Sequence, residues 1–542
     1  MTFITSENLL QEKSPFMSYE ATNQLRNLSL NPINLSCPDQ LTPERLKNYY
    51  GEACGYKLLY GTEKVTDEVI EALDELAKES KALEKMKRMQ DGEVMNFVKP
   101  YPSENRPVLH TATRDFFEQP RTASKAKEAA HLARQEIDKL KSFMAKLELE
   151  KKFNDLIVIG IGGSELGPRA NYVALQHLQK PGRKVYFISN VDPDEATAIL
   201  KAVNLKHTLV VSISKSGTTL ETQTNEEFVR DKFKKAEIDP QEHFISVTMP
   251  GTPMNNRESY FESFYLWDWI GGRFSTTSMV GGVILSFAFG FDVYWEMLRG
   301  AHDMDRAALQ PDIKKNLPLL EALLGIWNHN FLKYPTLGII PYSQALRYYP
   351  AHLQQVDMES NGKLIDQQGK FVDFETGPVL WGAPGTNAQH SFFQLLHQGT
   401  STVPLLMIGF KKNQYGEDLE VSGTTSQEKL LSNLFAQSLA LALGNQPDNP
   451  NKFCPGNRPT HLLLGEQLTP YSLGALLAFY EHKVAFQGFI WGINSFDQEG
   501  VQLGKILANR LIERFADQRQ KTQDKKPDLL VDAYLKHLES FH

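Results

Sequence analysis

The chain has 542 residues, 41% of them hydrophobic and 23% charged, so it is long enough for two or more cores, and its composition excludes a disordered or disulfide-scaffold protein. Its net charge of −7 is small for this length and favours neither a nucleic-acid partner nor an anionic membrane surface. Three widely spaced cysteines fit reduced thiols, and no secretory signal pattern is present. We therefore expect a cytoplasmic globular protein without nucleic-acid or membrane partners.

The N-terminal part of the sequence has uneven periodicity. Residues 1–55 show weak periodicity and scattered prolines, which predicts an irregular arm over a later core. Residues 66–92 and 124–149 both carry apolar residues at helical spacing, which predicts two amphipathic helices. An uncharged stretch of 18 residues at 274–291 opens with hydroxyl residues and contains three glycines, so we expect a buried segment rather than a membrane span.

Short apolar runs alternate with helical patterns through the middle of the chain. A first series of expected strands is followed by a long helical stretch at 300–332 and then by a second series. Strands that alternate with helices of 10–15 residues predict βαβ units, so we expect two parallel α/β sheets. Two helices should end the chain, separated by Pro527. The expected strands are 156–161, 184–189, 208–214, 243–249, 336–343, 403–410 and 461–468, and the final helices are 501–515 and 529–537.

A glycine-rich turn follows the first expected strand and precedes a helix. It has the sequence GIGGSELGP from Gly160, and its backbone N–H groups and the helix dipole suit an anion. Glu165 stands where the dinucleotide fingerprint requires glycine, and the Walker pattern is absent, so neither nicotinamide nor ATP is expected. An ordinary strand-to-helix turn without a ligand is the alternative.

A second loop carries hydroxyl groups to the start of a helix. Residues 214–219, here called the hydroxyl loop, have the sequence Ser-Lys-Ser-Gly-Thr-Thr after another expected strand. Four hydroxyls and an ammonium at the positive end of a helix suit a phosphate dianion, and Gly217 allows the backbone to curl around it. Ordinary N-capping is the alternative, but it accounts for only one hydroxyl.

Single ionisable residues are less informative. Glu359 and His390 lie in polar, glycine-containing loops, and Lys505 lies on a helical pattern, so each taken alone is better explained as a solvated side chain. No HxH, HExxH or Cys/His cluster of ligand spacing occurs, so no metal is expected.

Taken together, these segments resemble the glucose-6-phosphate isomerase (phosphoglucose isomerase) family. The resemblance implies two sugar-isomerase (SIS-like) doubly wound parallel-sheet α/β domains with the active site between them, an N-terminal helical extension and a C-terminal helical arm. We place the extension at 1–121, the domains at 122–288 and 289–515, and the arm at 516–542. The matching stretches are 92–96, 104–114, 160–168, 214–219, 272–275, 358–363, 384–390 and 496–505.

The resemblance also implies a reaction, the reversible isomerisation of glucose 6-phosphate to fructose 6-phosphate through a cis-enediol, with no cofactor. Glu359 matches the base that moves a proton between C2 and C1, and Arg273 matches the arginine that stabilises the enediolate. His390 and Lys505 match the pair that opens the sugar ring. The expected substrate-binding residues are Gly163, Ser164, Ser214, Lys215, Ser216, Gly217, Thr218, Thr219, Gln355 and Gln498.

Members of this family are dimers, so we expect a homodimer in which His390 reaches the site of the partner subunit. A non-catalytic sugar-phosphate sensor is the main alternative, since it would keep the hydroxyl loop but would not need Glu359, Arg273, His390 and Lys505 together. An isomerase that also accepts mannose 6-phosphate stays open.

Overall fold

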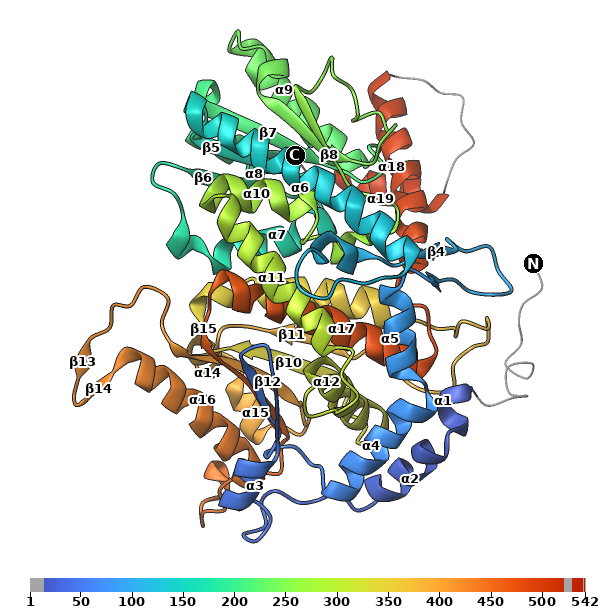
Figure 1. Cartoon of the computed structure of the whole chain (residues 1–542), viewed down its shortest axis with the longest axis vertical. Coiled ribbons are helices and arrows are strands. Elements are labelled where there is room, and N and C mark those ends of the chain that lie inside the picture. The colour runs from blue at the N-terminus through green and yellow to red at the C-terminus, as the bar shows by residue number, and fades with distance from the viewer. Residues whose placement is uncertain (1–13, 521–528, 540, 542) are drawn as a thin grey trace. The chain divides into compact units, whose positions relative to one another are not determined.

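The computed structural model describes residues 14–520, 529–539 and 541, and Figure 1 shows their elements. The chain divides into two compact units, Met1–Phe496 and Asp497–His542. The larger unit contains two parallel-stranded sheets with helices on both faces, which confirms the predicted α/β class. None of the described helices is both long and apolar enough to cross a bilayer.

The first sheet is entirely parallel, with the strand order β6-β5-β7-β8-β9. Its strands are nearly continuous apolar runs, as expected where both faces are covered. Because the chain leaves β5 in one direction and returns on its other side as β7, the strand order reverses between these two strands, and ligands of doubly wound sheets bind at that point. The strands are β5 (Asp155–Ile159), β6 (Lys184–Ile188), β7 (Thr208–Ile213), β8 (Phe244–Thr248) and β9 (Glu262–Tyr265).

The helices of the first sheet divide between its two faces according to the alternation of side chains along the strands. Leu156 and Val158 of β5 share a cluster with the helices of one face, and Ile157 and Ile159 share another with those of the opposite face. The first group is α6 (Ser124–Glu150), α7 (Leu166–Ala174) and α10 (Met279–Phe289), and the second is α8 (Pro193–Ala202) and α9 (Leu220–Lys235).

The second sheet has the strand order β1-β2-β15-β12-β10-β11. Four of its strands are parallel, while β2 pairs antiparallel with β15 and β1 forms the edge. The order of its parallel strands again reverses, here between β10 and β12. The strands are β1 (Tyr50–Ala53), β2 (Tyr56–Leu59), β10 (Thr336–Pro341), β11 (Val379–Gly382), β12 (Leu405–Lys412) and β15 (Thr460–Gln467).

One hydrophobic cluster joins the two sheets through a layer of helices between their inner faces. The helix α17 is buried along most of its length and packs against α11, which accounts for its apolar sequence without helical periodicity. The layer includes α11 (Phe291–Ala307), α12 (Leu317–Ile326), α13 (Tyr349–Gln354) and α17 (Pro470–Trp491), and the outer face of the second sheet carries α14 (Gly385–Gln389), α15 (Phe393–Gln398) and α16 (Ser426–Leu443).

The prediction of an irregular N-terminal arm was wrong for the described part of residues 1–55. These residues form α1 (Pro15–Ser18), α2 (Glu20–Ser29) and α3 (Pro43–Asn48), and they contribute to the hairpin β1–β2. The hairpin is formed because β2 pairs with β15, about 400 residues later in the sequence, and this pairing leaves no local pattern.

Other element boundaries differ in detail. The single helix expected at 66–92 is two helices, α4 (Asp67–Glu79) and α5 (Ala82–Gln90), because Lys81 between them has φ +54°. The apolar run at 274–291 is the buried helix α10. In the smaller unit the two expected helices are α18 (Gln502–Gln520) and α19 (Leu529–Glu539). Short strands lie at β3 (Val94–Asn96), β4 (Arg106–Pro107), β13 (Glu420–Val421) and β14 (Thr424–Thr425).

Candidate active site

Three short helical segments of the larger unit meet beyond the strand ends of the first sheet: Gly162–Ser164 after β5, Gly272–Phe274, and the π-helical turn Gln355–Glu359 after α13. A Cβ atom at position 163 would lie 2.2 Å from the carbonyl carbon of Gly272, so only glycine permits this backbone approach. The glycine turn thereby packs directly against the segment that carries Arg273. Ser164, a predicted substrate-binding residue, is half-buried in this turn.

Arg273 and Glu359 form the centre of the site. The Arg273 side chain is only 1% exposed, and its Nη1 donates to Glu359 Oε2 at 3.0 Å. Two further bonds fix the guanidinium, from Nε to Ser360 Oγ at 2.6 Å and from Nη2 to the Ser495 carbonyl at 2.7 Å. A guanidinium fixed in this way can stabilise negative charge without reorganising.

Glu359 itself is partly open to solvent, with 24% of its side chain exposed. Gln355 Nε2 donates to the same oxygen, Oε2, at 3.2 Å. Among the described residues, Oε1 accepts no hydrogen bond. The carboxylate is thus oriented through one oxygen while the other is available to take a proton, which is the geometry required of a general base.

The hydroxyl loop lies at the carboxyl end of β7, across the strand-order reversal from the glycine turn on β5. Ser214 Oγ and Thr219 Oγ1 are 2.8 Å apart, the Gly217 N–H donates to Ser214 Oγ at 3.1 Å, and Thr218 Oγ1 donates to Ser216 Oγ at 2.9 Å. Gly217 has φ +68°, which glycine adopts without strain.

The N-capping alternative for the hydroxyl loop is not what the structure shows. Thr219 immediately precedes α9, yet its side chain makes no capping hydrogen bond. The hydroxyls instead bond to one another and to loop N–H groups, which leaves the first-turn N–H groups of α9 directed toward the loop.

Lys215 is placed differently from the hydroxyls. Its ammonium donates to the carbonyl oxygens of Asp268 at 2.7 Å and Ile270 at 2.8 Å, just before the segment that carries Arg273. Burial, together with repulsion from Arg106, lowers the pKa of Lys215 to about 8. In this arrangement Lys215 fastens the hydroxyl loop to the neighbouring segment, and its predicted role in substrate binding stays a prediction.

His390 caps the short helix α14 on the outer face of the second sheet. Its side chain is exposed and makes no hydrogen bond or ion pair with the residues that the structure describes. In the smaller unit, Gln498 precedes a short helical turn, and Lys505 is exposed in the first turns of α18. The predicted roles of these three residues stay predictions.

Sequence reasoning missed the buried groups that support Glu359. Asp357, in the same π-helical turn, accepts from Lys483 Nζ at 2.5 Å and from the Tyr480 hydroxyl at 2.9 Å, and all three side chains are buried. The ionisable residues of α17 interrupt an otherwise apolar helix, and that interruption was the available signal.

A second buried polar cluster, also missed, lies behind Phe274. Arg114 bonds both carboxylate oxygens of Asp305, at 2.8 and 2.7 Å, and Glu481 at 2.8 Å. Burial raises the pKa of Glu481 to about 7, although Arg114 acts in the opposite direction. His110 stacks on the Phe274 ring with centroids 4.9 Å apart. Through His110, this cluster packs against Phe274, the residue next to Arg273.

Metal ligands do not gather in the described part of the chain: residues 14–520, 529–539 and 541 contain no group of three or more His, Cys, Asp or Glu side chains that could hold an ion.

Comparison with known proteins finds similar chains over almost the whole length of the sequence. The family model described as "Phosphoglucose isomerase" matches residues 59–528. The chain is 64% identical to the glucose-6-phosphate isomerase of Protochlamydia amoebophila, over 97% of this chain and 98% of that one, and 51% identical to that of Chlamydia caviae, over 92% and 95%. The crystal structure of a glucose-6-phosphate isomerase from Chlamydia trachomatis superimposes with a TM-score of 0.93 at 47% identity, covering 97% of this chain and all of that one.

Proposed function

The chain belongs to the phosphoglucose isomerase family, and from this premise we propose that it interconverts D-glucose 6-phosphate and D-fructose 6-phosphate. The observation that carries the proposal is the pairing of a partly exposed carboxylate with a buried, fixed guanidinium, Glu359 with Arg273. An aldose–ketose isomerisation requires these two functions, a base for the proton on C2 and a cation for the charge that develops on the oxygens.

The proton transfer is redox-neutral within the sugar. Glu359 Oε1 takes the proton from C2 of the open-chain aldose, the electron pair of that bond forms the C1–C2 double bond, and the C1 carbonyl electrons move to O1, which gives the enediolate. The O2 hydroxyl proton passes to O1, and Glu359 returns its proton to C1 as the C2 carbonyl forms, which gives the ketose. A positioned base contributes about 10²–10⁴ in rate. Arg273 stabilises the oxyanion, since its bonds to Ser360 and to the Ser495 carbonyl keep it in position throughout.

The phosphate group binds in this proposal at the hydroxyl loop. The loop hydroxyls and the N-terminus of α9 lie at the reversal of strand order, where doubly wound sheets bind ligands. Gly163 and Ser164 line the adjacent turn, and Gln355 positions the sugar next to Glu359. Gln498 supplies a further polar contact.

Ring opening comes before proton transfer for the cyclic sugar, and we assign it to His390 and Lys505. The exposed, unpartnered ring of His390 fits a residue offered to a second subunit, so we propose a homodimer in which each His390 completes the partner's site. The first domain, 122–288, then supplies Arg273 and the hydroxyl loop, and the second, 289–515, supplies Glu359. The extension 1–121 and the arm 516–542 complete the chain, which we place in the cytoplasm.

A coupled assay tests the proposed reaction. Purified protein with glucose 6-phosphate and EDTA should form fructose 6-phosphate, detected by a coupling enzyme that does not require the chelated metal. A sugar-phosphate sensor would bind the substrate without forming product. Binding without turnover, at protein concentrations that saturate the ligand, would therefore contradict the isomerase proposal and favour the sensor.

A further inference from the structure

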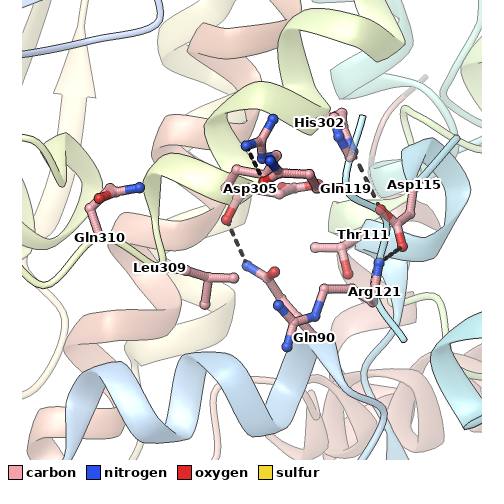
Figure 2. Close-up of a pocket in the computed structure, with 10 residues that line it drawn as sticks. Gln90, Thr111, Asp115, Gln119, Arg121, His302, Asp305, Leu309 and Gln310 are labelled. Carbon is pink, nitrogen blue, oxygen red and sulfur yellow. Dashed lines mark hydrogen bonds and ion pairs between the residues drawn. The ribbon is translucent and has the colours of Figure 1, made fainter. Parts of the chain in front are cut away.

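A second polar cavity, of about 190 Å³, lies in the larger unit away from Glu359, between α5, the turn His110–Arg114 and α11 (Figure 2). It shares Asp305 with the buried cluster next to Phe274, but none of the predicted site residues lines it. Its lining is Gln90, Thr111, Asp115, Gln119, Arg121, His302, Asp305, Arg306, Leu309 and Gln310.

The cavity is rich in hydrogen-bond donors that have no acceptor. The Thr111 side chain is buried, and its hydroxyl oxygen has no hydrogen-bond partner among the residues that the structure describes. Arg306 uses Nη2 to donate to Gln119 Oε1 at 2.6 Å, and Arg121 donates through Nε and Nη2 to Asp91 Oδ1, at 2.9 and 2.5 Å. The other guanidinium nitrogens of these two arginines make no hydrogen bond with the described residues. A buried hydroxyl without a partner is costly, so such a site favours a ligand or ordered water that supplies acceptors.

The two carboxylates that line the cavity already have hydrogen-bond or ion-pair partners. Asp305 accepts two bonds from Arg114 and one from His482 Nε2 at 2.6 Å. Asp115 accepts the Arg121 backbone N–H at 2.8 Å, and its other oxygen lies 3.4 Å from His302 Nδ1. Burial alone would lower the pKa of His302, but Asp115 and the Glu118 carbonyl outweigh it and raise that pKa. Arg121 is paired with Asp91, so Arg306 is the lining arginine that has no carboxylate partner among the described residues, and the unbalanced charge of this cavity is positive.

We propose that this cavity is a second anion site, which binds a small molecule through a phosphate or carboxylate group. The oxyanion accepts from Arg306 and Arg121, which are suited to planar oxyanion recognition, and from the Thr111 hydroxyl. At roughly 30 Å³ per water in the liquid, the cavity holds about six water-sized groups. This volume fits a phosphate or carboxylate with a few carbon atoms.

The experiment measures inorganic phosphate binding by calorimetry to the full-length protein saturated with 6-phosphogluconate, an open-chain substrate mimic that occupies the active site. We expect one phosphate per chain to bind in its presence. Arg306→Gln should weaken that binding tenfold or more, and Thr111→Val, which keeps the shape of the side chain, should weaken it several-fold. Arg299→Gln is the matched control, since Arg299 lies on the same helix and does not line the cavity.

Three outcomes would overturn the proposal: no phosphate binding at millimolar concentrations either to the blocked enzyme or to Ser214→Ala/Thr219→Ala, equal losses in Arg306→Gln and Arg299→Gln, or full binding in both cavity variants. A second arm removes the dependence on 6-phosphogluconate by using Ser214→Ala/Thr219→Ala, in which the cavity should still bind phosphate. The isomerase assay is independent of these readouts, and Arg306→Gln should keep wild-type turnover, so failure of the anion site and failure of the proposed reaction are distinguishable.

Discussion

Glu359 illustrates how one carboxylate can be both fixed and reactive. Oε2 accepts from the buried Arg273 and from Gln355, while Oε1 has no partner among the described residues. The neighbouring Ser360 and Ser495 bond the guanidinium rather than the carboxylate, so they hold the pair without competing for the reactive oxygen.

The first prediction removes the base while keeping its shape. Glu359→Gln should lower kcat for isomerisation by a factor of about 10²–10⁴, because an amide cannot take the C2 proton. The affinity for 6-phosphogluconate, measured by calorimetry, should stay within a few-fold. Glu262→Gln, at a partly exposed glutamate paired with Lys139 and Arg257, serves as the control and should keep wild-type turnover. More than about a tenth of the wild-type rate in Glu359→Gln would show that another group is the base.

The second prediction concerns the support of that base. Asp357 is bonded by Lys483 and Tyr480 two residues before Glu359, in a π-helical turn that this buried contact anchors. Asp357→Asn keeps the size of the side chain but weakens the contact, so Glu359 should be less well placed against C2. We expect kcat to fall about tenfold or more with KM within a few-fold, since small misplacements at a reacting centre are costly and the phosphate is held elsewhere.

Thermal stability separates this positioning role from general destabilisation. Arg183→Met removes another buried guanidinium, which bonds the Phe287 carbonyl and Glu148 remote from Glu359. It should lower Tm without lowering kcat, whereas Asp357→Asn should lower kcat at temperatures well below its Tm. If both variants lose stability and neither loses kcat, Asp357 is structural only.

At the scale of elements, the hydroxyl loop joins β7 to the N-terminus of α9, and in the proposed function its polar groups bind one phosphate dianion. Replacing Ser214 and Thr219 together by alanine should remove two hydrogen bonds to a charged group, about 1.5–3 kcal/mol each. The inhibition constant of 6-phosphogluconate should therefore rise tenfold or more. This binding energy also orients the reacting carbons, so part of its loss should appear as a lower kcat. An unchanged inhibition constant would move the phosphate to the glycine turn at 160–164.

A buried histidine of the second sheet holds the segment that follows the N-terminal hairpin. His461 of β15 lies 2.7 Å from Glu63 and 2.9 Å from Glu321 of α12, and all three side chains are buried. Burial alone would lower the pKa of His461, but the two carboxylates outweigh it and raise that pKa to about 10. The folded protein thus binds a proton between pH 6.5 and about 10 that the unfolded chain has released.

The sign of the pH dependence follows from this difference. The stabilisation by His461 is complete below pH 6.5 and is lost as the pH rises toward 10. In histidine-labelled protein, one ring resonance should stay in its protonated position at pH 8, and His461→Gln should abolish it. A His461 resonance that titrates near pH 6.5 would contradict the pairing, and so would a ring that is neutral at pH 7.

Particular elements show what the sequence could and could not predict. The strands of both sheets were visible because parallel strands covered on both faces are continuous apolar runs. The hairpin β1–β2 was not, because its stability comes from pairing with β15. The hydroxyl loop and the glycine turn could be predicted because their hydroxyl residues and glycines are close together in the sequence. Asp357, Lys483 and Ser495, by contrast, reach the site only through tertiary packing, and no spacing in the sequence connects them.

At the scale of the whole molecule, the proposed dimer explains how residues on opposite faces of the second sheet could act in one reaction. Glu359 follows α13 on the inner face, whereas His390 follows α14 on the outer face with an exposed ring. We propose that His390, which is exposed on the outer face in one chain, completes a site in a neighbouring chain. Two-fold symmetry then gives each dimer two composite sites.

The last prediction tests this sharing by subunit exchange between two inactive variants, Glu359→Gln and His390→Ala. In a mixed dimer one site would combine both substitutions and the other would have both native residues. Random pairing makes half of the dimers mixed, each with one intact site of two, so activity should recover to about a quarter of the wild-type value. If Glu359 and His390 instead act within one chain, every site in the mixture carries one substitution and no activity returns. Native mass spectrometry of differently tagged variants verifies the exchange, so a mixture that contains mixed dimers and stays inactive would refute the contribution of His390 across the interface.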